Sequence, residues 1–460
     1  MIHKTVILDG TRSEDGEKFT PVFTLLMEEL RDSGTKVQTF KLNDIKINHC
    51  IGCFNCWSKT PGRCVHTADT GAEILQEILN SNTVIFFTPV VFGGYSSELK
   101  KIADRSLPFV LPFLRRIYGE THHPTRYSIF PRFVGIGVCT HPQKELSDCF
   151  RTFVGRSAAN LETGYAAEVV STTDSPDRLR LLFHSLLCRE DSLPGRNELI
   201  SLMDDTLPVP DTSISTGNRK VLLIIGSPKT NSPSTSATLG SYLLERLEKY
   251  GWKTASLTLG KKLYSTQGQS DLYATIIWAD TIILSAPLYY DALPFLVTKA
   301  FEVIAARRES IKNKQPKNFL AIMNNGFPES YQNAVALSIC RNFAMECGSN
   351  WIGGLALGAG EGLLSGHRIT GFKGFRGFKR PPLYHVVHAL DITAAALAAG
   401  QPVPRKAVQL MDRKPIPFIP FNLWRWMYMK IAKKMWYKEA LENGITKEMM
   451  LDKPYMPEPD

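Results

Sequence analysis

Two stretches of the sequence repeat one order of elements, and this repeat constrains the fold more than any other feature. A buried-strand pattern that runs into a loop rich in Gly, Ser and Thr occurs at residues 4–16 and again at 219–236. Each is followed by a helical pattern that ends at a glycine, Gly34 or Gly251. Strands that alternate with helices of this length predict right-handed crossovers and a parallel sheet covered on both faces. The chain is therefore predicted to contain two α/β domains.

The spacing between equivalent residues of the two copies locates an insertion. Gly10 and Gly226 are 216 residues apart, whereas Pro89 and Pro287 are 198 apart, so the first copy has 216 − 198 = 18 extra residues. These must lie within 42–82, the interval that contains four clustered cysteines. Because the second copy completes the pattern without this segment, we interpret it as a functional insertion.

The predicted division of the chain has four parts. These are a first domain over 1–205 with the cysteine segment at 47–70, a linker at 206–218, a second domain over 219–370, and a basic C-terminal helical extension over 371–460. The linker assignment rests on its content of Pro, Ser, Thr and Gly.

Charge and composition narrow the class of protein. Residues 361–438 contain fourteen Lys and Arg against three acids, or +11, so the rest of the chain is nearly neutral. No nucleic-acid-binding module accompanies this charge, and no nucleic-acid partner is expected. The chain enters a strand pattern directly after Met1, lacks an apolar run of the ~18 to 20 residues that a spanning helix needs, and has an odd number of cysteines. We therefore expect a cytoplasmic protein with free or metal-bound thiols.

The loops at the carboxyl ends of the first strands are candidate ligand sites, because open parallel sheets bind ligands at that edge. The second copy offers hydroxyls, one cation and no acid, which favours an anion at a helix N-terminus. The residues are Ser227, Lys229, Ser232, Ser234 and Thr235. The first copy instead has Glu14, Asp15 and Glu17, which would repel a phosphate.

A second pair of loops combines a proline turn with aromatic residues, and in the first copy with paired glycines that would let the backbone approach a flat ring. The first copy contributes Pro89, Val90, Phe92, Gly93, Gly94 and Tyr95, and the second contributes Pro287, Leu288, Tyr289 and Tyr290. The aromatic residues could equally belong to the core or to an interface.

The cysteine segment has the spacing C-x2-C-x2-C-x7-C, at Cys50, Cys53, Cys56 and Cys64. Three thiolates this close suit the iron of a cluster. The residues also permit a metal-free apolar lid that includes Trp57, since free cysteines are often buried. Zinc, which usually takes ligands as two separated pairs, and a disulfide fit the spacing less well.

The motifs "GSPKTNSPSTS", "PLYYDALPFLVTKAFE" and "PVVFGGYSSELKKIADR" resemble the phosphate and isoalloxazine loops of flavodoxin-like NAD(P)H-dependent FMN reductases. The resemblance covers roughly residues 4–200 and 219–360. It implies two tandem flavodoxin-like domains, with FMN phosphate at Ser227, Lys229, Ser232 and Ser234 and the ring near the proline-turn residues of the second copy. The cysteine motif resembles that of the iron-sulfur flavoproteins, which implies a 4Fe-4S cluster beside FMN.

The expected function is NAD(P)H-dependent FMN oxidoreduction, with electrons passing to an unidentified acceptor. No GxGxxG fingerprint follows a first strand, so NAD(P)H would visit the flavin face. The alternative is a non-enzymatic flavin or iron-sulfur electron carrier, or a redox-responsive binding module. A homodimer is compatible with the sequence. The basic C-terminal helix is interpreted as packing on its own domain or a dimer mate, in preference to peripheral contact with a membrane.

Overall fold

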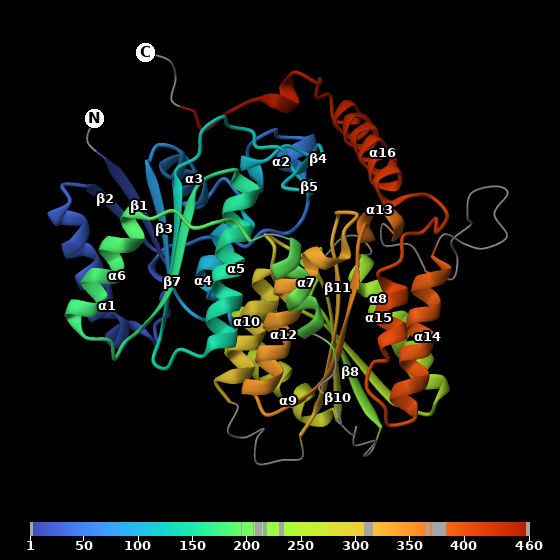
Figure 1. Cartoon of the computed structure of the whole chain (residues 1–460). Helices are drawn as coiled ribbons and strands as arrows, with labels where there is room; N and C mark the ends of the chain where they lie inside the picture. Colours follow the sequence, from blue (N-terminus) through green and yellow to red (C-terminus); the bar gives the residue numbers. More distant parts are fainter. Residues whose placement is uncertain are drawn as a thin grey trace. The chain divides into compact units, whose positions relative to one another are not determined.

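The computed structural model in Figure 1 describes residues 3–194, 196–205, 207, 214, 219–229, 234–307, 316–364, 369 and 383–456. The chain divides into two compact units: unit 1 is Met1–Gly195 with Ile431–Asp460, and unit 2 is Arg196–Lys430. Apart from Leu207 and Ile214, the predicted linker lies outside the described residues, as does the predicted site residue Ser232.

Unit 1 is built on a five-stranded parallel sheet. Its order is β2 (Lys36–Lys41), β1 (Lys4–Asp9), β3 (Thr83–Pro89), β6 (Arg132–Cys139) and β7 (Tyr165–Ser171). Strand β3 is buried along its whole length, as a strand covered on both faces must be. This strand order is the flavodoxin-like one, and it confirms the predicted fold class.

Helices cover both faces of this sheet. On one face, α1 (Gly16–Asp32) and α6 (Pro176–Cys188) share a core with the strands. On the other, α5 (Lys144–Leu161) packs closely because Gly135 of β6 has no side chain: a Cβ there would lie 2.4 Å from Val154. The remaining elements are η1 (Leu42–Asp44), α2 (Asn55–Ser58), α3 (Gly71–Leu79), α4 (Ser97–Asp104), η2 (Leu107–Phe109), and the hairpin strands β4 (Arg115–Ile117) and β5 (Glu120–His122).

Unit 2 repeats the sheet. Its order is β9 (Lys253–Thr258), β8 (Lys220–Ile225), β10 (Thr281–Pro287), β11 (Asn318–Asn324) and β12 (Asn350–Leu357), again all parallel. After β9 the chain passes through η3 (Lys261–Tyr264) directly into α9 (Thr266–Trp278). The cysteine segment thus has no counterpart in the second copy, which agrees with its interpretation as an insertion.

The helices of unit 2 include part of the predicted C-terminal extension. Helices α8 (Thr235–Lys249), α14 (Tyr384–Ala398) and α15 (Arg405–Met411) share the core on one face of the sheet. On the other, α10 (Phe295–Ala305) and α12 (Ala334–Glu346) meet through stacked Phe301 and Phe343, with ring centroids 3.7 Å apart. The remaining helices are α7 (Arg196–Asp205), η4 (Ser330–Asn333) and α13 (Gly360–Leu364). Residues 383–411 therefore complete the second domain.

The basic C-terminal helix α16 (Phe421–Glu442) has buried aromatic residues, and η6 (Met449–Leu451) follows it. Within unit 2, Trp424 and Tyr428 are buried, and the Tyr428 hydroxyl donates to the Gly326 carbonyl at 2.7 Å. Within unit 1, Trp436 packs on Trp57. Among the described residues, none of the helices is long and apolar enough to cross a membrane.

Candidate functional site

The cysteine segment of unit 1 follows a tightly turned path. Gly52 and Phe54 both have left-handed backbone conformations, with φ of 64° and 54°. A single helical turn, α2, then carries Cys56 and Trp57. Gly62 also has a positive φ, of 73°, and a Cβ there would lie 2.6 Å from the Pro454 side chain. Only glycine fits this position without strain.

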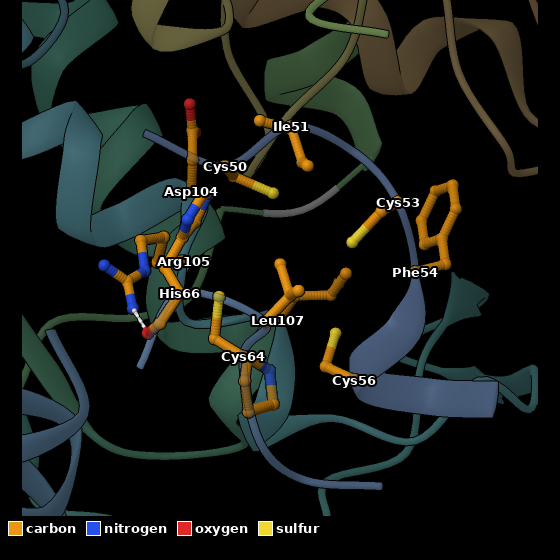
Figure 2. Close-up of a pocket in the computed structure, with 12 residues that line it drawn as sticks. Cys50, Ile51, Cys53, Phe54, Cys56, Cys64, His66, Asp104, Arg105 and Leu107 are labelled. Carbon is orange, nitrogen blue, oxygen red and sulfur yellow. Dashed lines mark hydrogen bonds between the residues drawn. The ribbon is translucent and has the colours of Figure 1, made fainter. Parts of the chain in front are cut away.

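The four cysteines of this segment border one cavity. Cys50, Cys53, Cys56 and Cys64 line one cavity that is open to solvent, together with Asp104 and Arg105 at the end of α4 and Leu107 and Pro108 of η2. Figure 2 shows the four sulfur atoms directed toward one another across this space. All four are free thiols, so the segment is not held by a disulfide.

Burial keeps the thiols of the cavity neutral in the absence of a compensating positive charge. The pKa of Cys50 is raised to about 12, mainly by burial and also by the charges of Asp104, Cys64 and Cys53, although a hydrogen bond from the Gly52 backbone lowers it. Burial likewise raises the pKa of Cys56, and the three other cysteines add to the effect. Buried thiols this close cannot ionise together unless a positive charge compensates them. Metal coordination supplies that charge and deprotonates a thiol.

The cysteines are nevertheless not gathered around one point. In the described part of the chain, no group of three or more His, Cys, Asp or Glu side chains is placed to hold a single metal ion. A structural zinc site needs four ligands about 2.0 to 2.3 Å from one ion. A polynuclear cluster distributes its thiolates over several irons, so it suits ligands that surround a cavity.

Aromatic packing fixes the cysteine segment from one side. The Trp57 ring stacks on Phe54 at 5.1 Å between centroids and meets the edge of Trp436 at the same distance. Its indole N–H donates to the Val110 carbonyl at 3.0 Å. The apolar packing predicted for Trp57 is therefore present alongside the cavity.

Residues 450–455 pack against the cysteine segment at Gly62, next to Pro454, and are bound to Arg126 and Tyr127. Arg126 donates from Nη1 to the carbonyls of Met450, at 2.7 Å, and Asp452, at 2.8 Å. The Tyr455 backbone N–H donates to the Tyr127 hydroxyl at 3.2 Å. These contacts join residues more than 320 positions apart. Nothing in the local sequence indicated them.

The proline-turn loops of the two copies have the same structure. In unit 1, Val91 and Gly94 exchange backbone hydrogen bonds, and in unit 2 Tyr289 and Ala292 do the same. Both central residues of each turn have positive φ: Phe92 and Gly93 in the first, Tyr290 and Asp291 in the second. Each loop follows a strand whose neighbour leads into the candidate phosphate loop. The topology therefore brings the two predicted loops to one sheet edge in each unit.

The ring-loop residues differ in exposure between the copies. In unit 2 Pro287, Leu288, Tyr289 and Tyr290 are half-buried, so they border solvent. In unit 1 Pro89 is buried and Val90 is half-buried, while Phe92, Gly93 and Gly94 are buried.

Tyr95 belongs to the core of unit 1. The residue is 1% exposed, and its ring stacks on Phe153 at 4.0 Å between centroids. Its hydroxyl forms a hydrogen bond with the Ser157 hydroxyl. Of the two roles that the sequence left open for this aromatic residue, its position in this structure is that of a core residue.

In unit 2 a carboxylate of the same unit, Glu361, binds residues of the candidate phosphate loop. Lys229 forms an ion pair with Glu361 at 2.8 Å, and the Thr235 hydroxyl lies 3.5 Å from the other Glu361 oxygen. The Ser234 hydroxyl caps α8 by accepting from the Ala237 N–H, and Ser227 is buried. Glu361 therefore competes with any anion for the predicted ligands.

In unit 1 the equivalent loop also contains an internal ion pair. The Asp15 carboxylate accepts from Arg12 Nε at 2.6 Å and Nη2 at 2.8 Å, and the Arg12 backbone N–H points to it as well. The acids that the sequence placed here thus neutralise the one cation of the loop.

We expect Glu361→Gln to strengthen phosphate binding in unit 2, because Lys229 loses its counter-charge. A partly exposed ion pair contributes about 0.2 to 1 kcal/mol, so the affinity for FMN in this unit should rise by a factor of about 1.4 to 5. Isothermal titration with FMN measures this, riboflavin serves as the phosphate-free ligand, and Glu245→Gln on the exposed face of α8 is the control. An equal gain for riboflavin would contradict the role of the phosphate.

Comparison with known proteins finds relatives of the first copy. Residues 4–113 match the model of the family described as NADPH-dependent FMN reductase. An iron-sulfur flavoprotein of Methanocaldococcus jannaschii is 36% identical over 117 residues, which is 25% of this chain and 56% of that protein. An iron-sulfur flavoprotein of Archaeoglobus fulgidus is 34% identical over 94 residues, 20% of this chain and 41% of that protein. The chain thus spans about half the length of these relatives.

Among solved structures, an FMN-dependent NADH-azoreductase from Bacillus anthracis in complex with FMN aligns with a TM-score of 0.30 and 13% identity. The alignment covers 40% of this chain and 95% of that one.

Proposed function

We propose that this chain is an oxidoreductase that passes electrons from NAD(P)H through FMN to an acceptor. The match of residues 4–113 to the model of the NADPH-dependent FMN reductase family supports this proposal. The cavity bordered by four thiols in the same unit carries the finer part of the proposal, which is that an iron-sulfur cluster takes part in the transfer. Bound FMN would accept a hydride, and the cluster would supply single-electron transfer.

The residues present fit a cluster. Cys50, Cys53, Cys56 and Cys64 provide four soft ligands around one cavity, the number that a 4Fe-4S cluster requires. Arg105 and Arg126 are buried beside the segment, and their charges act on Cys64 and Cys56. Fixed cations offset the negative charge of thiolates in a buried site.

We propose that the FMN that works with the cysteines binds in unit 1, at the carboxyl ends of β1 and β3. The ion pair of Asp15 with Arg12 offsets part of the acidic charge that would repel its phosphate there. The family match covers both loops there. Gly10 donates its backbone N–H to the Phe87 carbonyl at 2.8 Å, and the Ser96 hydroxyl donates to the Gly10 carbonyl at 2.6 Å, so the two loops are held together. The second proposed FMN site is in unit 2 and consists of its ring-loop residues with Ser227, Lys229, Ser234 and Thr235. Glu361 opposes binding of the phosphate there because it is paired with Lys229.

Anaerobic reduction tests the proposed activity. Protein purified without oxygen should show flavin absorbance that NADPH or NADH bleaches. Flavin that bleaches only with dithionite would contradict the enzyme and favour the electron carrier. Protein that binds no flavin, even when FMN is added, would contradict both.

A further inference from the structure

Arg105 is a buried cation at the wall of the cysteine cavity. It follows α4 directly, and its side chain is completely buried. Nη1 donates to both Asp69 oxygens at 2.6 Å, and Nη2 donates to the His66 carbonyl at 2.9 Å. Figure 2 shows the guanidinium in the cavity wall beside Cys64.

One nitrogen atom of this guanidinium, Nε, makes no hydrogen bond among the described residues. This atom is completely shielded from solvent. The Cys64 side chain is nevertheless close enough to act on the guanidinium by charge and hydrogen bonding. Burial lowers the pKa of Arg105, but Asp69 and Cys64 raise it above its ordinary value. Arginine stays charged in proteins, so a fixed cation lies in the wall of the cavity that Cys64 also lines.

The surroundings are built to hold this arginine. A Cβ at Gly71 would lie 2.5 Å from the Arg105 Cζ, so the start of α3 has room for the guanidinium only because this residue is glycine. Asp69 is fixed in turn by the backbone N–H groups of Asn48, at 2.8 Å, and Gly71, at 3.0 Å. Because desolvation is costly, a buried ion pair often adds no net stability to the fold. We therefore look for a functional role of the Arg105–Asp69 pair at the cavity.

We propose that Arg105 is a positioning residue that donates from Nε to the sulfur of Cys64 and thereby raises the reduction potential of the cluster held by the four cysteines. The inference rests on the proposed function. Hydrogen bonds to cluster sulfurs and nearby charge set the potential of such centres, because reduction adds a negative charge that a fixed cation stabilises. A lysine cannot replace the planar fork that binds Asp69 and Cys64 together.

Two variants test this proposal. Arg105→Lys keeps a positive charge but loses the Nε donor. The double variant Asp69→Asn with Arg105→Met removes both buried charges together, so no uncompensated charge remains. The potential of the cluster is measured by a redox titration followed by electron paramagnetic resonance. We expect both potentials to fall, that of the double variant by about a tenfold change in the reduction equilibrium, which is 59 mV for one electron.

The control is Arg151→Met, which removes a half-exposed cation of α5 that is not among the cavity residues. Its potential should equal that of the unmodified protein. If the unmodified protein binds no iron, the cluster in the proposed function fails, and the inference about Arg105 fails with it. If it binds iron and Arg105→Lys keeps its potential, the inference about Arg105 fails while the proposed function stands. If the double variant loses its iron, the reduction potential of Arg105→Lys alone tests the inference about Arg105.

Discussion

Cys56→Ser is expected to remove nearly all bound iron and acid-labile sulfide from protein purified without oxygen. Cys56 is buried in α2 at the cavity wall, so water cannot readily replace its thiolate as a ligand. Serine keeps the size and adds a hydroxyl that binds iron poorly compared with a soft thiolate. Iron and sulfide analysis, with the visible absorbance of the cluster, measures the result.

The matched control is Cys188→Ser. Cys188 is an exposed free cysteine at the end of α6 and is not among the cavity residues. This variant should keep the iron and sulfide content of the unmodified protein. A Cys56→Ser protein that is folded and retains its full iron content would show that the cavity does not hold the metal.

Asp69→Asn is expected to destabilise unit 1 strongly. The Asp69 and Arg105 side chains are both completely buried, so the substitution leaves a buried guanidinium without its counter-charge. Removal of one partner of a buried ion pair costs about 3 to 5 kcal/mol of unfolding free energy. Urea denaturation of the full chain, followed by circular dichroism, measures the loss. Asp148→Asn, in the exposed pair with Lys144, should leave the curve nearly unchanged.

The same pair predicts a pH dependence. Burial alone would raise the pKa of Asp69, but hydrogen bonds from Arg105 and the Asn48 and Gly71 N–H groups lower it from 3.8 to about 2. A depressed carboxyl pKa stabilises the folded state above the unfolded value, and this contribution is lost as pH falls through about 2. Asp69→Asn should therefore be destabilised relative to the unmodified protein at pH 6 and much less so near pH 2. An equal difference at both pH values would contradict the ion pair.

The order of elements could be predicted from the sequence because it depends on local periodicity. The strand and helix patterns after residues 4 and 219 gave both sheets, and the 18-residue difference in spacing located the insertion. The cysteine spacing likewise placed the residues that border the cavity. Each of these features depends only on residues that are close together in the sequence.

Side-chain partners that are distant along the chain could not be predicted in this way. Lys229 is 132 residues from Glu361, and Arg105 is 36 from Asp69. The sequence shows that such charges exist, but only the folded chain decides which of them meet. For the same reason the sequence did not indicate that Lys229 is paired with Glu361, or that Tyr95, a candidate for either the ring site or the core, lies in the core.

The C-terminal region shows a second limit. Helices α14 and α15 belong to the core of unit 2, although the region was interpreted as an extension. The segment "ITAAALAAG" is apolar at helical spacing and is compatible with a core helix. Its separation from the repeat by the basic segment 371–382 concealed this role.

Cofactor analysis of the unmodified protein tests the central claim most directly. One sample purified without oxygen is analysed for iron, acid-labile sulfide, zinc and FMN. The account predicts iron and sulfide in equal amounts, about four of each per chain as in a 4Fe-4S cluster, together with FMN. Protein that contains FMN but neither iron nor sulfide, or that contains zinc in their place, would contradict it.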